Sequence, residues 1–165
     1  MFDKEKGVSL IELLITVTVM SILLAVSFWG YKDRGRELAF ERAVFNFTTK
    51  LEQVREMAMS AQEVGTERPE GGYGVHFTIG NSYIIFVDSF ADKVYTAADT
   101  VVDTVSLEEG TGISALSDTP LDIVFEPPSP SVYINGALGT AEITLSGAGR
   151  SRKIIINSAG LISTE

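Results

Sequence analysis

The chain opens with a long apolar stretch that contains a single charge. Between Gly7 and Tyr31 every residue is uncharged except Glu12. A helix from Val8 to Gly30 would be about 34 Å long, which is enough to cross the hydrocarbon core of a bilayer. Because a carboxylate inside such a span costs free energy and is usually functional, we expect Glu12 to have a partner.

A second helical pattern follows the apolar stretch. Apolar residues recur at alternating gaps of four and three, the spacing of one apolar face. These residues are Phe40, Val44, Phe47, Leu51, Val54, Ala58 and Ala61. The pattern predicts an amphipathic helix over residues 31–63 that packs on a sheet, with a coiled-coil seam as the alternative. Because glycine weakens helices, we expect any melting or bend to lie near Gly30.

After Val64 the apolar residues alternate with polar ones, as in strands. Turn residues mark the change, and Gly80-Asn81 indicates a tight hairpin. The pattern predicts strands at Gly74–Ile79, Ser82–Val87, Thr100–Leu107, Leu121–Glu126, Val132–Asn135, Ala141–Ser146 and Lys153–Asn157. Many short strands behind one helix predict an α+β fold, with a long N-terminal helix packed on an antiparallel β-rich head.

The charge is distributed unevenly along the chain. The formal net charge is −9, and residues 64–165 carry thirteen acidic against five basic side chains. A surface of this sign generally repels the phosphate backbones of nucleic acids. The chain has no cysteine, which excludes thiol catalysis and thiolate metal sites.

The string Lys6-Gly7-Val8-Ser9-Leu10-Ile11-Glu12-Leu13 resembles the processing site of type IV prepilins and type II secretion pseudopilins. The resemblance implies that a prepilin peptidase removes a leader, residues 1–7, by cutting between Gly7 and Val8. Val8 would then become an N-methylated terminus. It also implies that Glu12 pairs with the terminal amine of a neighbouring subunit, so that two buried charges neutralise each other.

The rest of the chain is similar to the GspH/FimT-like minor pilins. The similarity lies in the helix of residues 31–63, in G-Y-G-V-H-F at 72–77 and in I-I-I-N-S-A-G-L-I at 154–162. It implies a transmembrane or filament-core helix over residues 8–30 and a pilin-like head over residues 64–165. The implied function is that of a structural, non-enzymatic subunit of a type IV pilus or a type II secretion-like filament.

The same resemblance implies the location and the partners of the chain. The protein would cross the inner membrane once, with its head outside the cytoplasm, before it enters a filament. Its partners would be the prepilin peptidase, other pilin or pseudopilin subunits, the inner-membrane assembly machinery and membrane lipid. Lysines and arginines flank the apolar stretch on both sides, so charge counting leaves the orientation open and only the resemblance places residues 1–7 inside.

Three other interpretations of the apolar stretch stay open. It would be a secretory signal if Ala25-Val26-Ser27 were a cleavage site, although Glu12 and the length of the stretch argue against this. It would be a plain membrane anchor if Glu12 were incidental. A buried helix of a soluble protein is the third.

Enzymatic and metal chemistry find little support in the sequence. The single histidine, His76, lies in a predicted strand, and neither G-x-S-x-G nor H-E-x-x-H occurs. Asp88, Asp92, Asp99 and Asp103 offer oxygen ligands for calcium, but their spacing matches no calcium loop, so we expect a solvated acidic loop. We predict no enzyme, no cofactor and no metal site.

A basic cluster suggests the alternative function. Arg150, Arg152 and Lys153 lie at a predicted turn before a strand, where arginines could hold phosphate oxygens. The cluster would suit a DNA-binding minor pilin used for DNA uptake, but the surrounding acidity opposes this. A guard for a strand edge, or a bridge to an acidic neighbour, fits the charge better. A membrane-anchored adhesin that does not assemble is a further alternative.

Overall fold

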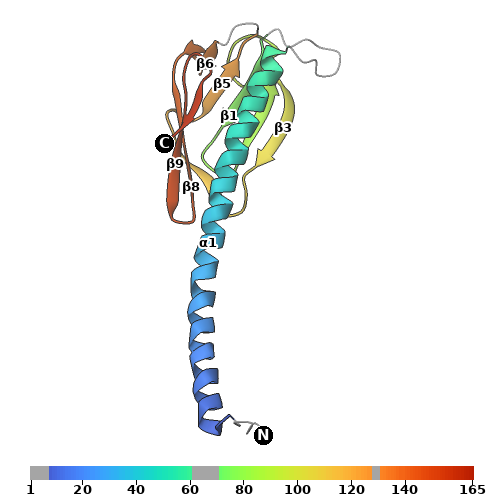
Figure 1. Cartoon of the computed structure of the whole chain (residues 1–165). Coiled ribbons are helices and arrows are strands. Elements are labelled where there is room, and N and C mark those ends of the chain that lie inside the picture. Colours follow the sequence, from blue (N-terminus) through green and yellow to red (C-terminus); the bar gives the residue numbers. More distant parts are fainter. Residues whose placement is uncertain (1–7, 61–70, 128–130) are drawn as a thin grey trace. The chain divides into compact units, whose positions relative to one another are not determined.

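The computed structural model describes residues 8–60, 71–127 and 131–165, and it omits the side chains of residues 28–34. The chain forms two compact units, Met1–Leu38 and Ala39–Glu165, which are described separately. The helix α1 (Leu10–Met59) contributes to both units (Figure 1). It is helical through Gly30 and Gly35, so this structure shows no break in the helix near Gly30, where we expected any melting to lie.

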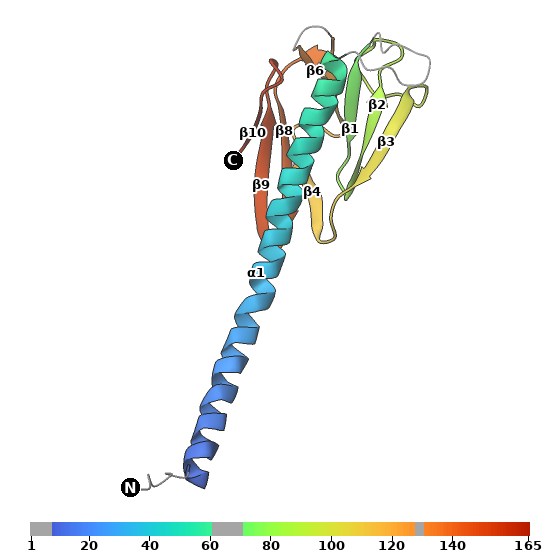
Figure 2. The same cartoon turned by 45° about the vertical axis from the view of Figure 1, so that its right-hand side comes forward.

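The second unit contains two antiparallel sheets beside residues 39–59 of α1 (Figure 2). The six-stranded sheet has the order β3-β2-β1-β5-β6-β7, and the four-stranded sheet has the order β10-β9-β8-β4. The strands are β1 (Tyr73–Phe77), β2 (Ser82–Val87), β3 (Thr100–Ser106), β4 (Thr111–Leu116), β5 (Leu121–Phe125), β6 (Val132–Ile134), β7 (Ala137–Leu138), β8 (Ala141–Gly147), β9 (Arg150–Ile156) and β10 (Ile162–Thr164). The predicted α+β, pilin-like fold is confirmed.

The apolar face of α1 forms part of the core, as its spacing predicts. Six of the seven residues of the predicted stripe, all but Ala61, are buried, and Ala61 lies outside the described residues. Phe47 lies between two aromatic rings of the sheet, with its centroid 5.7 Å from that of Phe77 and 5.3 Å from that of Tyr83. The helix therefore packs on the sheet, and this face is not a coiled-coil seam.

The seven predicted strands are all present, with small changes at their ends. β1 ends at Phe77 instead of Ile79, because Gly80 pairs with Ile113 of β4 in an isolated bridge between the two sheets. The β1–β2 hairpin is therefore confirmed, but its connection is longer than the predicted two residues. β4, β7 and β10 were not predicted, because two of them are very short and β4 begins with Thr-Gly.

All four outer strands are short or irregular. β3 has a bulge at Val102, which lies between the residues that pair with Ile85 and Phe86. β4 has a similar irregularity at Ser114, between Ile113 and Ala115. The other two edges, β7 and β10, have only two and three residues. Such features keep sheet edges from pairing with other chains.

The prediction of a solvated acidic loop is wrong for two of its four aspartates. Asp88 and Asp99 are buried, because their carboxylates accept hydrogen bonds from the backbone of the β2–β3 connection. Asp88 accepts from the N–H groups of residues 92 and 93, at 3.3 and 3.0 Å. Asp99 accepts from the N–H groups of Ser89 and Thr96, at 3.1 and 2.7 Å. These carboxylates replace the backbone partners that an irregular loop lacks.

Candidate functional site

The first unit presents an apolar helical surface. Residues Leu10–Ser27 have a mean hydropathy of 2.3, and none of this segment is buried within the protein. Among the described residues it is the one helix segment long and apolar enough to cross a membrane. Apolar side chains at this density do not remain in water, so the segment needs lipid or other helices around it.

The hydroxyl groups of this segment are satisfied within the helix itself. Each donates to a carbonyl oxygen three or four residues earlier in the chain: Thr16 to Leu13 (2.9 Å), Thr18 to Leu14 (2.7 Å), Ser21 to Val17 (2.8 Å) and Ser27 to Leu23 (2.8 Å). Such bonds remove the need for water around these groups. The polar residues of the segment are therefore compatible with hydrocarbon, and Glu12 is the exception.

Glu12 lies in the first turn of α1. The N–H groups of Glu12 and Leu13 donate to the carbonyl oxygen of Ser9, at 3.0 and 3.2 Å, so Ser9 is the N-cap residue directly before the helix. A carboxylate in a first turn is favoured by the partial positive charge of the helix N-terminus. Val8 and Glu12 are both exposed, and Gly7 lies outside the described residues. The chain thus has an exposed carboxyl group in the first turn of an exposed apolar helix.

The basic cluster lies within a strand and not at a turn before one. The turn is formed by Ala148 and Gly149, both with positive φ, and Arg150 already pairs with Gly147 as the first residue of β9. The prediction placed this strand's start three residues too late. Arg150, Arg152 and Lys153 are therefore strand residues of an antiparallel hairpin, in which successive side chains point to opposite faces.

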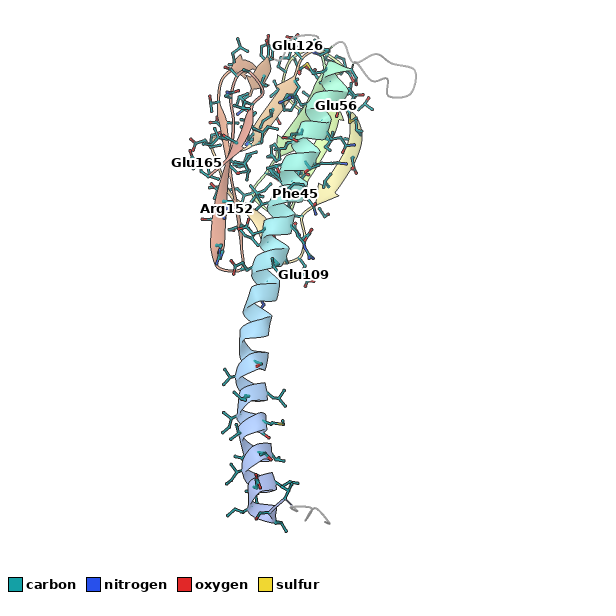
Figure 3. The ribbon with its side chains drawn as sticks, in the orientation of Figure 1. Phe45, Glu56, Glu109, Glu126, Arg152 and Glu165 are labelled. Atoms are coloured by element: carbon teal, nitrogen blue, oxygen red, sulfur yellow. The ribbon has the colours of Figure 1, made fainter. Side chains whose placement is uncertain are left out.

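The cations of β9 are partnered within the head. Arg152, which is labelled in Figure 3, places its Nη2 3.0 Å from Glu41 Oε1 of α1. Lys153 Nζ lies 2.9 Å from Glu142 Oε2 of β8, and this carboxylate raises the pKa of Lys153. Arg150 also has an interaction partner. Arg152 and Lys153 therefore bridge to acidic residues of the head itself, but β9 lies between β10 and β8 and is not an edge strand, so the interpretation as an edge guard is wrong.

His76 is a strand residue, as predicted, and it has a structural partner. It pairs across the sheet with Asp122 of β5, and its Nδ1 lies 2.6 Å from Asp122 Oδ1. The other carboxylate oxygen of Asp122 accepts from the N–H of Tyr95 at 3.1 Å, and the ring of Tyr95 lies 4.6 Å from that of His76. The cluster fastens the β2–β3 connection to the sheet.

A buried lysine that the sequence did not predict holds the same connection at a second point. Lys93 Nζ donates to the carbonyl oxygen of Gly71 at 2.8 Å and lies 2.9 Å from Glu126 Oε1. It also lies 3.8 Å from Asp88 Oδ2 and 5.4 Å from the ring centre of Tyr133. Lys93 holds the pKa of the Glu126 carboxyl below its usual value. No sequence motif distinguishes this lysine from an exposed one.

Metal chemistry finds no support in the described part of the chain. There, no group of three or more histidine, cysteine, aspartate or glutamate side chains is arranged to hold a metal ion. The buried carboxylates Asp88, Asp99 and Asp122 instead bind backbone N–H groups, His76 or Lys93. Their arrangement stabilises the head.

Comparisons with known proteins agree with both parts of the chain. Residues 3–28 match the family model of the prokaryotic N-terminal methylation motif. Residues 43–160 match the family model of the type II transport protein GspH. Comparisons with curated proteins and with solved structures gave no match.

Proposed function

Since the chain belongs to the GspH family of type II transport proteins, and is thus a minor pilin or pseudopilin, we propose that Glu12 directs its assembly into a filament. The family is structural and not enzymatic. Its members are processed by a prepilin peptidase and assemble with other pilin subunits. The chain is accordingly a membrane-anchored protein that becomes part of a filament.

The proposal rests on one observation, which is the exposed anion at the start of an exposed apolar helix. Before assembly, lipid surrounds residues 8–30, and Glu12 lies close to the end of the segment, where a charge costs less than at the centre. During assembly, neighbouring helices replace the lipid. An unpaired carboxylate among packed helices would be destabilising, so a cation must join it.

The amine of a neighbouring subunit is the cation that the maturation chemistry supplies. Cleavage between Gly7 and Val8 frees an amino group at Val8, which N-methylation leaves positively charged. In the uncleaved chain no such amine exists at this position. The pair of Glu12 with the amine of the next Val8 would therefore link cleavage to assembly and set the axial register of the helices.

Replacement of Glu12 by alanine tests the proposal. We expect Glu12→Ala to leave expression and membrane insertion intact, and to lower incorporation into filaments at least tenfold, which corresponds to about 1.4 kcal/mol. The measurement compares the amount of the variant in sheared filaments with the amount in membranes. Thr16→Ala is the matched control, since its hydroxyl already bonds to its own helix and needs no neighbour.

Mass spectrometry of the native protein tests the maturation step. The expected N-terminus is a methylated Val8, with residues 1–7 removed. Filaments that contain Glu12→Ala at the wild-type level would contradict the role of Glu12. A protein that begins at Phe28, or that retains Met1 in filaments, would contradict the proposed processing.

The alternative functions make different predictions. A DNA-binding minor pilin would use Arg150, Arg152 and Lys153, but the ion pairs of Arg152 and Lys153 weaken this alternative. A membrane-anchored adhesin would remain in the membrane and form no cross-links to pilin subunits. Chemical cross-linking in intact membranes distinguishes such an adhesin from a filament subunit.

A further inference from the structure

A cavity of about 340 Å³ opens on the head between α1 and the edge strand β3. It lies between residues 43–50 of α1 and residues 103–108, and we call it the β3 cavity. Its inner wall is aromatic, because the rings of Phe47 and Tyr83 meet there with their centroids 5.3 Å apart. Figure 2 shows β3 as the outermost strand, beyond β2 and β1. Cavities of this size with an apolar wall and a few polar groups are typical of binding sites.

Asp103 occupies a position of β3 where an apolar residue is expected. It pairs with Ile85 of β2, which is buried, so its side chain lies on the side of the sheet that faces the core. Its carboxylate is close to the phenol of Tyr83, whose pKa is raised by burial and, after that, by the charge of Asp103. An inward-pointing charge can keep an edge strand from pairing with other chains, but it is also an acceptor for a ligand.

The polar groups of the β3 cavity carry more negative than positive charge. Asp103 and Glu108 supply two carboxylates, and Lys50 is the one cation among the residues that line the cavity. Lys50 Nζ lies 3.5 Å from Asp103 Oδ2, and the two side chains are 34% and 50% exposed. The exposed Glu108 accepts a hydrogen bond from Asn46 Nδ2 at 2.9 Å. Bridges between exposed groups contribute little to stability, so a ligand with a stronger donor can replace them.

We propose that the β3 cavity binds an arginine side chain of a different subunit of the filament. A guanidinium group has a positive charge and five N–H donors in one plane, so it can bind both carboxylates and stack on the ring of Tyr83. The apolar stem of the arginine would lie against Val105 and Leu107, which are packed on the core but only partly buried. Lysine has no planar group to stack and is the weaker ligand.

The charge of the head and the family of the chain favour this kind of partner. Residues 64–165 carry thirteen acidic against five basic side chains, so a basic segment is attracted over a distance as well as in contact. The inference rests on the proposed function, which makes other filament subunits the neighbours of the head. A different subunit, and not a second copy, fits a minor pilin or pseudopilin, because one such contact does not repeat along the filament.

Titration with a small arginine probe tests the chemistry of the cavity. The full chain in detergent micelles is labelled with nitrogen-15, and N-acetyl-arginine methylamide is added while amide signals are recorded. We expect saturable shifts at residues 46–50 and 103–108. N-acetyl-citrulline methylamide has the same shape without the charge, and it should bind about fivefold more weakly or less, because charge-assisted hydrogen bonds are the stronger ones. Equal binding of both probes, or the absence of saturable shifts, would overturn the arginine site.

Two variants separate a binding site from an ion pair that only stabilises the fold. Asp103→Asn should weaken binding of the arginine probe about fivefold, because it removes a charged acceptor. Lys50→Met should strengthen binding about twofold, because Lys50 competes for the same carboxylate. Glu142→Gln is the matched control, since Glu142 is also exposed and paired with a lysine but lies on β8. If Lys50→Met and Asp103→Asn weaken binding alike, the inference fails.

Photo-cross-linking in filaments tests the partner. Asn46, at the mouth of the β3 cavity, is replaced by p-benzoylphenylalanine, and the same replacement at Phe45 is the control, because Phe45 lies about 100° around the helix and does not line the cavity. We expect position 46 to cross-link to a different subunit beside an arginine, and changing that arginine to glutamine should abolish the product.

The outcomes of the cross-linking distinguish this inference from the proposed function. A product with a second copy of this chain, or with a segment that has no arginine, would refute the inference. So would filaments that contain the chain but give no product at position 46, and the proposed function would then still stand. A chain that never enters filaments would contradict the proposed function, whereas the titration with the arginine probe would still decide whether the site exists.

Discussion

Replacement of Lys93 by methionine should destabilise the head strongly. Methionine keeps most of the apolar stem but removes the ammonium group, which has four neighbours in the structure. The carbonyl oxygen of Gly71 loses its donor, and Asp88, which is 0% exposed, loses its nearest cation. Removing one partner of a buried ion pair costs about 3–5 kcal/mol, because the remaining charge stays buried without compensation. Glu126 adds less, because it is 33% exposed and water can solvate it.

The assay is thermal unfolding of the purified full chain in detergent, followed by near-ultraviolet circular dichroism of the aromatic core. For a head of this size, a loss of about 3–5 kcal/mol lowers the Tm by roughly 10 °C or more. The matched control is Lys153→Met. The Lys153–Glu142 pair has the same 2.9 Å distance as the Lys93–Glu126 pair, but its side chains are 43% and 49% exposed. Its removal should leave the Tm almost unchanged.

Comparing Lys93→Met with Lys153→Met shows whether the burial of an ion pair or the distance between its two charges determines how much it stabilises the head. If the two lysine variants lower the Tm by the same small amount, the argument from burial is refuted. A second variant, Asp88→Asn combined with Lys93→Met, removes both buried charges and should be more stable than Lys93→Met alone. A double variant that is less stable would show that the backbone hydrogen bonds of Asp88, and not the ion pair, dominate.

Three further predictions concern pH, the core and DNA. Lys93 lowers the folded-state pKa of Glu126, so the contribution of Glu126 to stability is present above its unfolded-state pKa and is lost as the pH falls through the lowered pKa. In urea unfolding at a series of acidic pH values, the free energy of unfolding of Glu126→Gln should therefore change less with pH than that of the wild type. Phe47→Ala should cost about 3–5 kcal/mol in the same unfolding assay, because it opens a cavity between α1 and the sheet, whereas Phe45→Ala should cost almost nothing. Binding to duplex DNA should be weak, and the slope of the logarithm of the binding constant against the logarithm of the salt concentration should be no steeper than about −2.7, the limit for the three cations of β9. A steeper slope would favour the DNA-binding alternative.

The periodicity of apolar residues predicted the parts of the fold that depend on residues close together in the chain, which are the helix, its buried face and the strands. The stripe from Phe40 to Ala58 is buried as predicted, because burying its one apolar face against another apolar surface lowers the free energy of an amphipathic helix. His76 was correctly expected in a strand.

The sequence did not predict features that depend on distant or unusual partners. Asp88 and Asp99 resemble solvated loop residues, and only the folded β2–β3 connection shows that their carboxylates bind backbone N–H groups. Asp122 lies 46 residues from His76, so no local spacing reveals their contact. The start of β9 was predicted three residues late, because Arg150 and Arg152 are hydrophilic, and edge or hairpin strands can carry charged side chains.

The bulged and short edge strands of the two sheets have a consequence for how neighbouring heads can contact one another. Strands that pair between subunits produce cross-β aggregates, which are extremely stable. Here the bulges of β3 and β4 and the brevity of β7 and β10 discourage that outcome even when many heads crowd together. Heads that lie close together in a filament would therefore keep their sheets separate, and contacts other than strand pairing would have to hold the subunits together.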